Sequence, residues 1–421
     1  MLRFRYIAII LCLLIALIGG SFITTSAAKR CLIKGKVIGR PASTYLVIYK
    51  QNEDPRIQGV EVPIVNGAFE FSIDSENIEK YELAFSEEYE SGSWQPLALF
   101  SEPGTIHLTL HDENNSKKNE VKGSKLTKEY WRFLRPILSK YEEVEQDFLS
   151  RSKQYLEGHY DLSFKGSSNL EEDLRSAIAQ LEESGVDTKE VIKEISEIER
   201  SIYDAAGEEI KQLKMQYIKE NPNIAGYSVL LSETTSAIQR NDYLEETIDI
   251  SPYTELYKTV FAPKFLYHPY SEQMEVLLAG LSIKPGSRFV DFSSAGLDGS
   301  PVQLSSRISD KAAILHLWAS WCGPCRKKGK ELIPIYEEYK DRGLVVIGVA
   351  RERSAQDAER AIKLDQYPWE NLVEINDKEG IWKKYGIGNS GGMVFLINKK
   401  GTIVAKDPTA SEVRKFLERE L

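Results

Sequence analysis

The sequence predicts a multidomain protein with an N-terminal antiparallel β domain, a helical middle region and a C-terminal α/β domain. Between residues 30 and 122, segments rich in β-branched and aromatic residues alternate with Pro, Gly, Asn and Asp. From residue 125, apolar residues recur at intervals of three and four, as in amphipathic helices. After residue 284, strand-like apolar runs alternate with helix-like segments, which is the order of a mixed sheet covered by helices.

Length and composition agree with this division. The chain has 421 residues, more than one typical domain, so two or three domains are expected. Hydrophobic residues make up 42% and charged residues 28%, which is enough apolar material for a sizeable core. A net charge of −9 argues against nonspecific binding to nucleic acid.

The N-terminus has the pattern of an export signal. Arg3 and Arg5 precede an apolar run over residues 6–18, and small residues follow up to Ala28. This pattern predicts a secretory signal peptide over residues 1–28, cleaved after Ala28, and therefore a periplasmic or cell-envelope location. An uncleaved membrane anchor is the alternative, because the apolar stretch continues weakly through residues 22–23.

The first predicted domain spans residues 30–122 and forms a small β sandwich or barrel. Its expected strands are 32–37, 45–50, 60–65, 69–73, 81–85, 97–100 and 106–110. Asn66-Gly67 predicts a tight type I′ turn, because both residues tolerate positive φ. His107 and His111 share one face of a strand, and we interpret them as surface histidines, with a metal role as the alternative.

The middle region, residues 123–283, is expected to be helical. Pro222 should end one helix and Asn169 should cap another. Charges of alternating sign indicate solvated helices, with a dimerisation coiled coil as the alternative. Residues 253–270 are rich in aromatic residues, which we interpret as core packing, although they could instead line a groove for a protein substrate.

The most informative segment lies in the predicted C-terminal α/β domain, residues 284–421. An apolar run over residues 312–318 is followed by Trp321, Cys322, Gly323, Pro324 and Cys325. A Cys-x-x-Cys pair that enters a helix from a buried strand has the geometry of thiol–disulfide exchange. The first sulfur lies at the helix N-terminus, where free N–H groups and the helix dipole stabilise a thiolate. The second sulfur, one turn away, can resolve a mixed disulfide.

An inert structural disulfide and a metal site are the alternatives for this pair. The chain has four cysteines, of which Cys12 lies in the predicted signal and Cys31 lies in another predicted domain. Zinc requires about four ligands, and no second Cys-x-x-Cys or His-x-His pattern supplies them. We therefore expect a redox-active disulfide without cofactor or metal. Cys31 either stays free or pairs between chains.

The C-terminal region resembles thioredoxin-like proteins. Residues 312–325 are similar to the active-site strand and turn of exported bacterial thiol–disulfide oxidoreductases in the AhpC/TSA-thioredoxin superfamily. The resemblance continues through 286–292 with Asp298-Gly299 (the first hairpin), 344–350 (the next parallel strand) and 395–404 (the closing hairpin). Residues 30–122 resemble a β-rich domain of unknown function that often precedes such domains.

This resemblance implies specific roles and partners. Cys322 would be the nucleophile and Cys325 the resolving cysteine. The residues that shape the pair would be Trp321, Gly323 and Pro324, and the backbone around Gly392 and Met393 would dock the substrate. The implied partners are client proteins with thiols or disulfides and a membrane electron donor. The Gly-Pro dipeptide equals that of reducing thioredoxins, which favours the reducing direction.

Two departures from the family pattern concern the backbone. Gly392 stands where the family usually has a cis-proline. A cis bond before a non-proline residue costs about 2.5–4 kcal/mol, so we expect a trans bond or a mobile loop there. Lys330 stands where a proline often kinks the helix, and Pro334 follows one turn later, so the kink should move or vanish.

A third departure concerns charge. Lys328 replaces a family acid, and Arg326, Lys327 and Lys330 lie nearby. If these side chains reach the sulfurs, their positive field should lower the thiol pKa. A solvated basic face at the start of the helix is the alternative.

Two other functions remain open on the sequence. One is a peroxidase, because peroxiredoxins share the fold. The other is a noncatalytic binding protein of the envelope with a degenerate thioredoxin domain. Peroxide consumption by the purified protein distinguishes the peroxidase, and insulin reduction distinguishes the binding protein, which would show no turnover.

Overall fold

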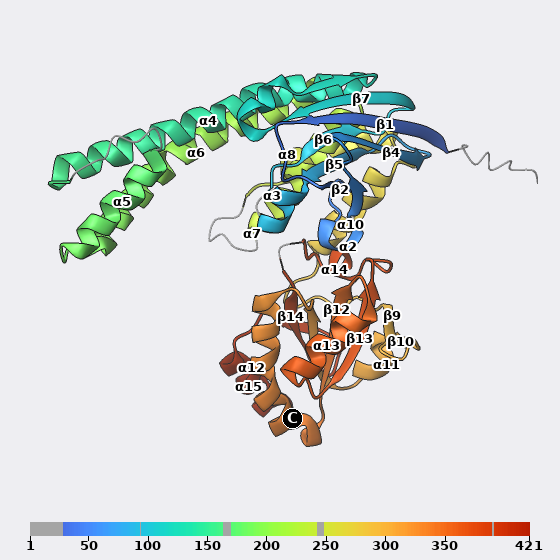
Figure 1. Cartoon of the computed structure of the whole chain (residues 1–421). Helices are drawn as coiled ribbons and strands as arrows, with labels where there is room; N and C mark the ends of the chain where they lie inside the picture. The colour runs from blue at the N-terminus through green and yellow to red at the C-terminus, as the bar shows by residue number, and fades with distance from the viewer. Residues whose placement is uncertain (1–27, 93, 163–169, 242–247, 390) are drawn as a thin grey trace, which may run out of the picture.

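The computed structural model describes residues 28–92, 94–162, 170–241, 248–389 and 391–421. Two β-sheets come first, a long helical region follows, and an α/β domain of thioredoxin-like fold ends the chain (Figure 1). The predicted fold class is therefore confirmed. The predicted signal peptide, apart from Ala28, and the predicted cap at Asn169 lie outside the described residues.

The two N-terminal sheets pack face to face around one apolar core. The first sheet has the strand order β4-β1-β7-β8 and the second β3-β2-β5-β6. The strands are β1 (Lys29–Ile38), β2 (Tyr45–Lys50), β3 (Val60–Pro63), β4 (Ala68–Ser75), β5 (Lys80–Phe85), β6 (Leu97–Phe100), β7 (Gly104–His111) and β8 (Glu120–Lys122). Residues from both sheets, such as Ile33, Ile106, Leu46 and Leu83, form the core between them.

One strand pair differs from the antiparallel prediction. β1 and β7 run parallel, whereas the other neighbours in both sheets are antiparallel. The chain passes through the whole second sheet between these two strands, so it can return to the first sheet in the same direction. The predicted turn is confirmed, because Asn66 and Gly67 have φ values of 51° and 69°.

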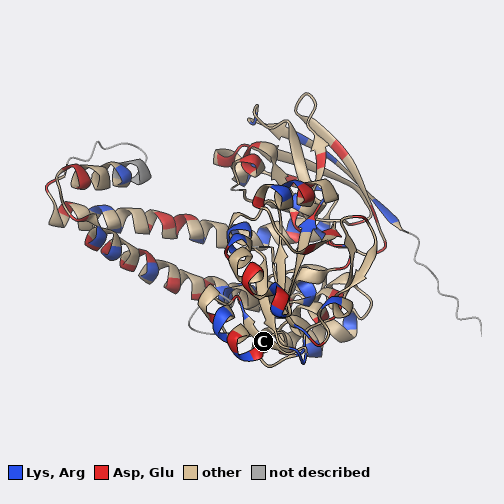
Figure 2. Ribbon diagram, turned by 90° about the horizontal axis from the view of Figure 1, so that it is seen from below, with Lys and Arg blue, Asp and Glu red and all other residues tan. Residues whose placement is uncertain are grey.

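Helices make up the middle region. They are α4 (Lys125–His159), α5 (Leu170–Glu183), α6 (Thr188–Glu220), α7 (Ile224–Asn241), α8 (Ser251–Leu256), the π-helical turn Tyr257–Phe261, α9 (Ala262–Lys264) and α10 (Pro269–Gly280). α6 ends just before Pro222, as predicted. α4 and α6 lie side by side and project from the sheets (Figure 1), with charges of both signs along them (Figure 2).

Most of the aromatic segment after α7 is core, as interpreted from the sequence, but Tyr267 is 92% exposed. Tyr253, Tyr257, Phe261 and Tyr270 are each less than 5% exposed and pack around Tyr227. Among the helices that the structure describes, none is both long enough and apolar enough to cross a lipid bilayer.

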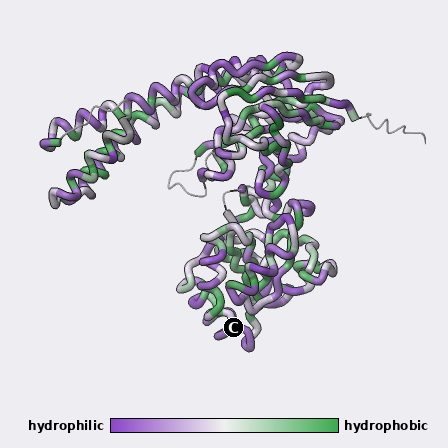
Figure 3. The backbone as a smooth tube through the Cα atoms, viewed as in Figure 1, coloured by the Kyte–Doolittle hydropathy of each residue, from purple (hydrophilic) through white to green (hydrophobic). Residues whose placement is uncertain are grey.

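A seven-stranded sheet of order β10-β9-β13-β12-β11-β14-β15 organises the thioredoxin-like domain. Its elements are β9 (Ser293–Gly296), β10 (Pro301–Gln303), α11 (Leu304–Ile308), β11 (Ala312–Trp318), α12 (Gly323–Tyr339), β12 (Leu344–Glu352), α13 (Ala355–Asp365), β13 (Glu370–Ile375), α14 (Ile381–Lys384), β14 (Met393–Ile397), β15 (Ile403–Lys406) and α15 (Ala410–Glu420). Hydrophobic chain segments run through its interior (Figure 3). β11 is central and all seven of its residues are buried.

One detail of this domain differs from the prediction, and another concerns the predicted change of the helix kink. The first hairpin consists of β9 and β10, so residues 286–292 are not its first strand. That segment instead pairs with the turn after β14, where Phe289 N–H donates to the Gly401 carbonyl oxygen at 3.0 Å. α12 continues through Pro334 to Tyr339, so the proline lies within one unbroken helix.

The N-terminal β domain docks on the thioredoxin-like domain through the short helix α2 (Pro55–Gln58). Arg351 at the end of β12 is 1% exposed, and its guanidinium pairs with Asp377 and, at 3.4 Å, with Asp54 just before α2. Arg353 donates to the Pro55 carbonyl oxygen at 2.6 Å. Buried charges persist only where they are paired, so these contacts set how the two domains meet.

A second contact joins the helical region to the thioredoxin-like domain. α10 ends at Gly280 against the turn after α14, and a Cβ on Gly280 would lie 2.7 Å from the Cα of Gly386. The two backbones therefore approach more closely than any side chain at this position would allow.

The Asp54→Asn substitution tests the docking contact. It removes a fully buried negative charge from Arg351 and Arg56, and breaking such a pair typically costs about 3–5 kcal/mol. We expect a lower free energy of unfolding in urea, followed by tryptophan fluorescence. Glu142→Gln, in a pair with Lys117 whose side chains are 56% and 72% exposed, is the control and should change little. Equal effects of the two substitutions would contradict this role of Asp54.

Candidate active site

Cys322 and Cys325 lie at the edge of the sheet where the central strand ends. β11 delivers the chain to Trp318, and Cys322 is the N-cap of α12. The Cys325 N–H donates to Cys322 Sγ at 3.3 Å. The two cysteines form a disulfide and are 5% and 6% exposed. The sequence-predicted pair is thus brought together at a helix N-terminus, where a thiolate at Cys322 gains hydrogen bonding and dipole stabilisation.

The loop around Gly392 lies directly beside the sulfurs. The peptide bond before Gly392 is trans, and the Gly392 N–H donates to Cys325 Sγ at 3.1 Å. A Cβ on Gly392 would lie 1.9 Å from the Leu317 carbonyl oxygen. Glycine is required here because the loop backbone rests against β11. Met393 then starts β14 opposite Leu317, which holds the loop in register with the central strand.

Trp321 is covered by a residue from the N-terminal domain. The Arg56 guanidinium lies 3.7 Å from the centre of a Trp321 ring, and Trp382 packs near the same side chain at 6.1 Å between ring centres. Arg56 also donates to the Asn389 carbonyl oxygen at 2.7 Å, in the segment that leads to Gly392. One side chain therefore contacts both segments that flank the disulfide. Gly323 and Pro324, in contrast, are exposed.

Glu352 anchors the turn before the cysteines. Its carboxylate accepts hydrogen bonds from the Ser320 N–H at 2.5 Å and the Ser320 hydroxyl at 2.9 Å. Burial raises the pKa of Glu352 above its ordinary value, and the bonds from Ser320 offset part of that rise. Glu352 thus fixes the backbone immediately before Trp321 and Cys322.

The basic residues of α12 are engaged by carboxylates rather than by the sulfurs. Arg326 and Lys330 both pair with Asp365, at 2.6 and 2.9 Å, and Lys328 pairs with Asp407 at 3.3 Å. Lys327 is exposed. The structure therefore favours a paired or solvated basic face, and the predicted extra positive field at the thiols is not supported.

Two further titratable side chains are held neutral by burial. Desolvation lowers the pKa of His316 to about 4, and its Nε2 donates to the Cys325 carbonyl oxygen at 3.2 Å, since a carbonyl can only accept. Burial raises the pKa of Cys31 to about 11, with Glu102 adding to the rise. Cys31 is a free, fully buried thiol and is therefore poorly reactive.

In the described parts of the chain, no group of three or more His, Cys, Asp or Glu side chains is arranged to hold a metal ion.

Sequence reasoning missed Glu352, Arg56 and Asn389. Glu352 follows a predicted parallel strand next to the cysteine strand, and the carboxyl ends of such strands are where functional groups gather, so a signal existed. Arg56 had no signal, because it lies in a different domain and reaches the site only through α2. Asn389 lies in a Gly-rich segment, and nothing in the sequence predicted its contacts with Arg351 and Arg56.

Two family models match the chain. Residues 285–406 match the AhpC/TSA family, and residues 31–130 match a domain of unknown function, DUF4369. The first match covers the disulfide and the Gly392 loop. The second covers α2 and the preceding residue, which carry Arg56 and Asp54. The fold and the disulfide site thus define a thioredoxin-like thiol–disulfide oxidoreductase domain with a separate N-terminal domain.

Two similar bacterial proteins belong to the same class by name. The thioredoxin-like protein YneN of Bacillus subtilis is 30% identical over 140 residues, which are 33% of this chain and 76% of YneN. The thiol-disulfide oxidoreductase ResA of Bacillus anthracis is 27% identical over 139 residues, 32% of this chain and 77% of ResA. The chain belongs to the family of thioredoxin-like thiol–disulfide oxidoreductases.

Among solved structures, the thioredoxin domain of a thiol-disulfide oxidoreductase from Bacteroides vulgatus is similar to this chain. It is 26% identical, with a TM-score of 0.30, and the match covers 33% of this chain and 98% of that one.

The Gly392→Ala substitution tests the close approach of the loop to β11. Because the new Cβ would meet the Leu317 carbonyl oxygen, the loop must shift, and overpacking of this kind costs about 1–3 kcal/mol. We expect a lower urea midpoint by tryptophan fluorescence. Gly391→Ala is the matched control, since its Cβ would meet only Cys322 Sγ, at 4.0 Å. Unfolding of both variants at the same urea concentration would contradict the requirement for glycine at position 392.

Proposed function

We propose that this protein reduces disulfides of client proteins in the cell envelope, with Cys322 as the nucleophile and Cys325 as the resolving cysteine. The observation that carries the proposal is the position of Cys322 at the N-terminus of α12, with the Cys325 N–H donating to its sulfur. Such an environment favours the thiolate, which is the attacking species. The Gly-Pro dipeptide between the cysteines supports the reducing direction.

The exchange proceeds in two steps. The Cys322 thiolate attacks one sulfur of the client disulfide, forms a mixed disulfide and releases the first client thiolate. The Cys325 thiolate then attacks Cys322 Sγ, forms the Cys322–Cys325 disulfide and releases the second client thiolate. Two electrons pass to the client, and solvent protonates both released thiolates. The Gly392 N–H, 3.1 Å from Cys325 Sγ, would stabilise the negative charge on the resolving sulfur.

Other groups would support these steps without touching the reacting bond. Trp321, Gly323 and Pro324 would shape the approach to Cys322, and the backbone at Gly392 and Met393 would dock the client.

The location in the cell envelope is proposed from the N-terminal pattern of Arg3, Arg5 and residues 6–18. The same pattern leaves open an uncleaved membrane anchor. A membrane electron donor would return the disulfide to the dithiol. We place the domain boundaries near residues 122 and 283, where the strands end and where α10 has ended.

Turnover and trapping with insulin test the proposal. The reduced full chain should reduce insulin, Cys325→Ser should accumulate a covalent insulin adduct that dithiothreitol releases, and Cys322→Ser should do neither. Cys31→Ala is the control and should turn over like the unmodified chain, because Cys31 is buried and unreactive. Absence of insulin reduction, or undiminished turnover by Cys322→Ser, would overturn the proposal.

A further inference from the structure

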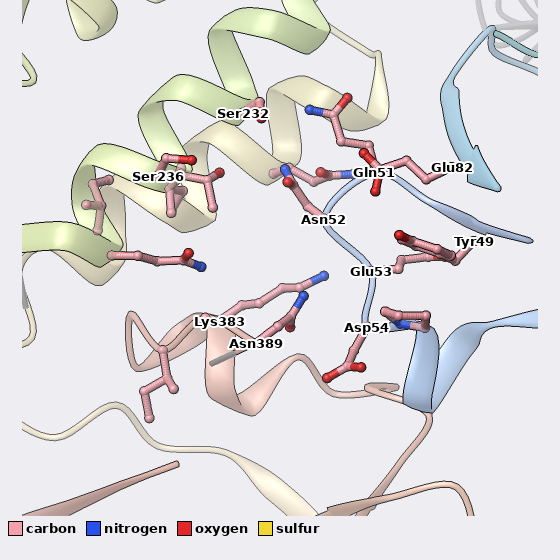
Figure 4. Close-up of a pocket in the computed structure, with 18 of the residues that line it drawn as sticks. Tyr49, Gln51, Asn52, Glu53, Asp54, Glu82, Ser232, Ser236, Lys383 and Asn389 are labelled. Atoms are coloured by element: carbon pink, nitrogen blue, oxygen red, sulfur yellow. The ribbon is translucent and has the colours of Figure 1, made fainter. Parts of the chain in front are cut away.

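A cavity of about 370 Å³ lies where the three parts of the chain meet (Figure 4). Its walls come from residues 49, 51–56, 82 and 94 of the β domain, from α7 and α10, and from residues 383 and 386–389 of the thioredoxin-like domain. Arg56 lines the cavity and also stacks on Trp321, the neighbour of Cys322. Asn389 lines it as well, and Gly391, where a Cβ would lie 4.0 Å from Cys322 Sγ, is only two positions further along the chain.

Buried hydrogen-bond acceptors in this wall lack donors. The cavity is lined by the carboxamides of Gln51, Asn52, Gln239, Gln273 and Asn389. Gln51 is 2% exposed, and its Nε2 donates to the Ser228 carbonyl oxygen at 2.7 Å, which sets the orientation of the amide. Its Oε1 and the Oε1 of Gln273 have no hydrogen-bond partner among the described residues. Because unpaired buried acceptors are costly, a ligand that brings N–H groups would be favoured here.

The unpaired charge in the cavity is positive. Asp54 is paired with Arg56 and Arg351, and Glu82 pairs with Lys80 at 3.1 Å. Lys383 extends from the thioredoxin-like side into the space near Asn52 and Asn389 (Figure 4). Its ammonium group has no hydrogen bond or salt bridge to the described residues, and its charge acts at longer range on Glu53 and Asp377, opposing the rise that burial causes in the pKa of each carboxyl group.

The remaining carboxyl group in the wall does not cancel this charge. Glu53 accepts a hydrogen bond from the Lys50 N–H at 3.1 Å. Burial raises its pKa, and the charges of Lys50 and Lys383 offset part of that rise. A ligand with an acidic group therefore finds a cation in Lys383.

We propose that this cavity binds an extended segment of the client polypeptide beside its reactive cysteine, with an acidic side chain of that segment paired to Lys383. Backbone N–H groups of the segment would donate to Gln51 and Gln273. A client that presents its sulfur to Cys322 would lie beside Gly391 and Gly392, and its chain would enter the cavity within a few residues. The inference rests on the proposed exchange function and gives the N-terminal domain a part in choosing clients.

Charge-matched substrates test this inference. Two disulfide-linked peptide dimers would differ only in carrying Asp or Lys at the positions three to five residues from the cysteine, on both sides. The second-order rate constant for oxidation of the reduced full chain would be measured for each dimer by stopped-flow tryptophan fluorescence. The readout is the ratio of the two rate constants, which cancels any effect of a substitution on the sulfurs themselves.

We expect the unmodified chain to prefer the acidic dimer by about five- to tenfold, as for a partly buried ion pair, and Lys383→Glu to reverse the preference. Lys384→Glu is the matched control, because its side chain is exposed on the same helix and outside the cavity, and it should keep the preference. If Lys383→Glu does not fold, Lys383→Gln should abolish the preference.

Two outcomes would overturn the inference and leave the exchange function intact. In the first, the unmodified chain reacts with hydroxyethyl disulfide, which is small and uncharged, but does not distinguish the dimers. In the second, the substitutions at Lys383 and Lys384 change the ratio equally. Failure of the reduced chain to react with hydroxyethyl disulfide and with either dimer would instead contradict the proposed function.

Discussion

The buried guanidinium of Arg351 is the constraint on which the arrangement around the disulfide depends. A cation that is 1% exposed must be surrounded by acceptors, and its acceptors come from three places. Asp377 lies in its own domain, Asp54 comes from the N-terminal domain, and the Asn389 side chain belongs to the loop that leads to Gly392. Satisfying this one charge therefore ties the docking of the N-terminal domain to the position of the loop beside the sulfurs.

The chemistry of the disulfide follows from what surrounds it. The sulfurs are contacted by backbone N–H groups, from Cys325 to Cys322 Sγ and from Gly392 to Cys325 Sγ. The nearby His316 is kept neutral by burial, and the cations of α12 are paired with Asp365 and Asp407. Backbone dipoles, rather than mobile charged side chains, are thus the main stabilisers of a thiolate at this site.

Local patterns in the sequence predicted most of the fold, because the helices, strands and turns are specified by residues close to one another in the chain. The Asn66-Gly67 turn, the helix end before Pro222 and the Cys-x-x-Cys helix start all depend on residues close in the chain. The parallel pairing of β1 with β7 was missed, since it joins strands separated by an entire sheet. The same limit explains the site: Cys322 and Cys325 were predictable from their spacing, whereas Arg56 and the cavity arise only from long-range docking. The need for glycine at position 392 was not predictable, because it arises from the contact of the loop with the Leu317 carbonyl oxygen of β11.

The reduction potential of the Cys322–Cys325 pair in the full chain would show whether the protein reduces client disulfides. It would be measured by equilibration with reduced and oxidised glutathione, followed by trapping of free thiols. We expect a value near or below about −250 mV, the range of a reductant that depends on a dedicated electron donor. A value between about −120 and −180 mV would mark an oxidase or isomerase and would contradict the reducing direction.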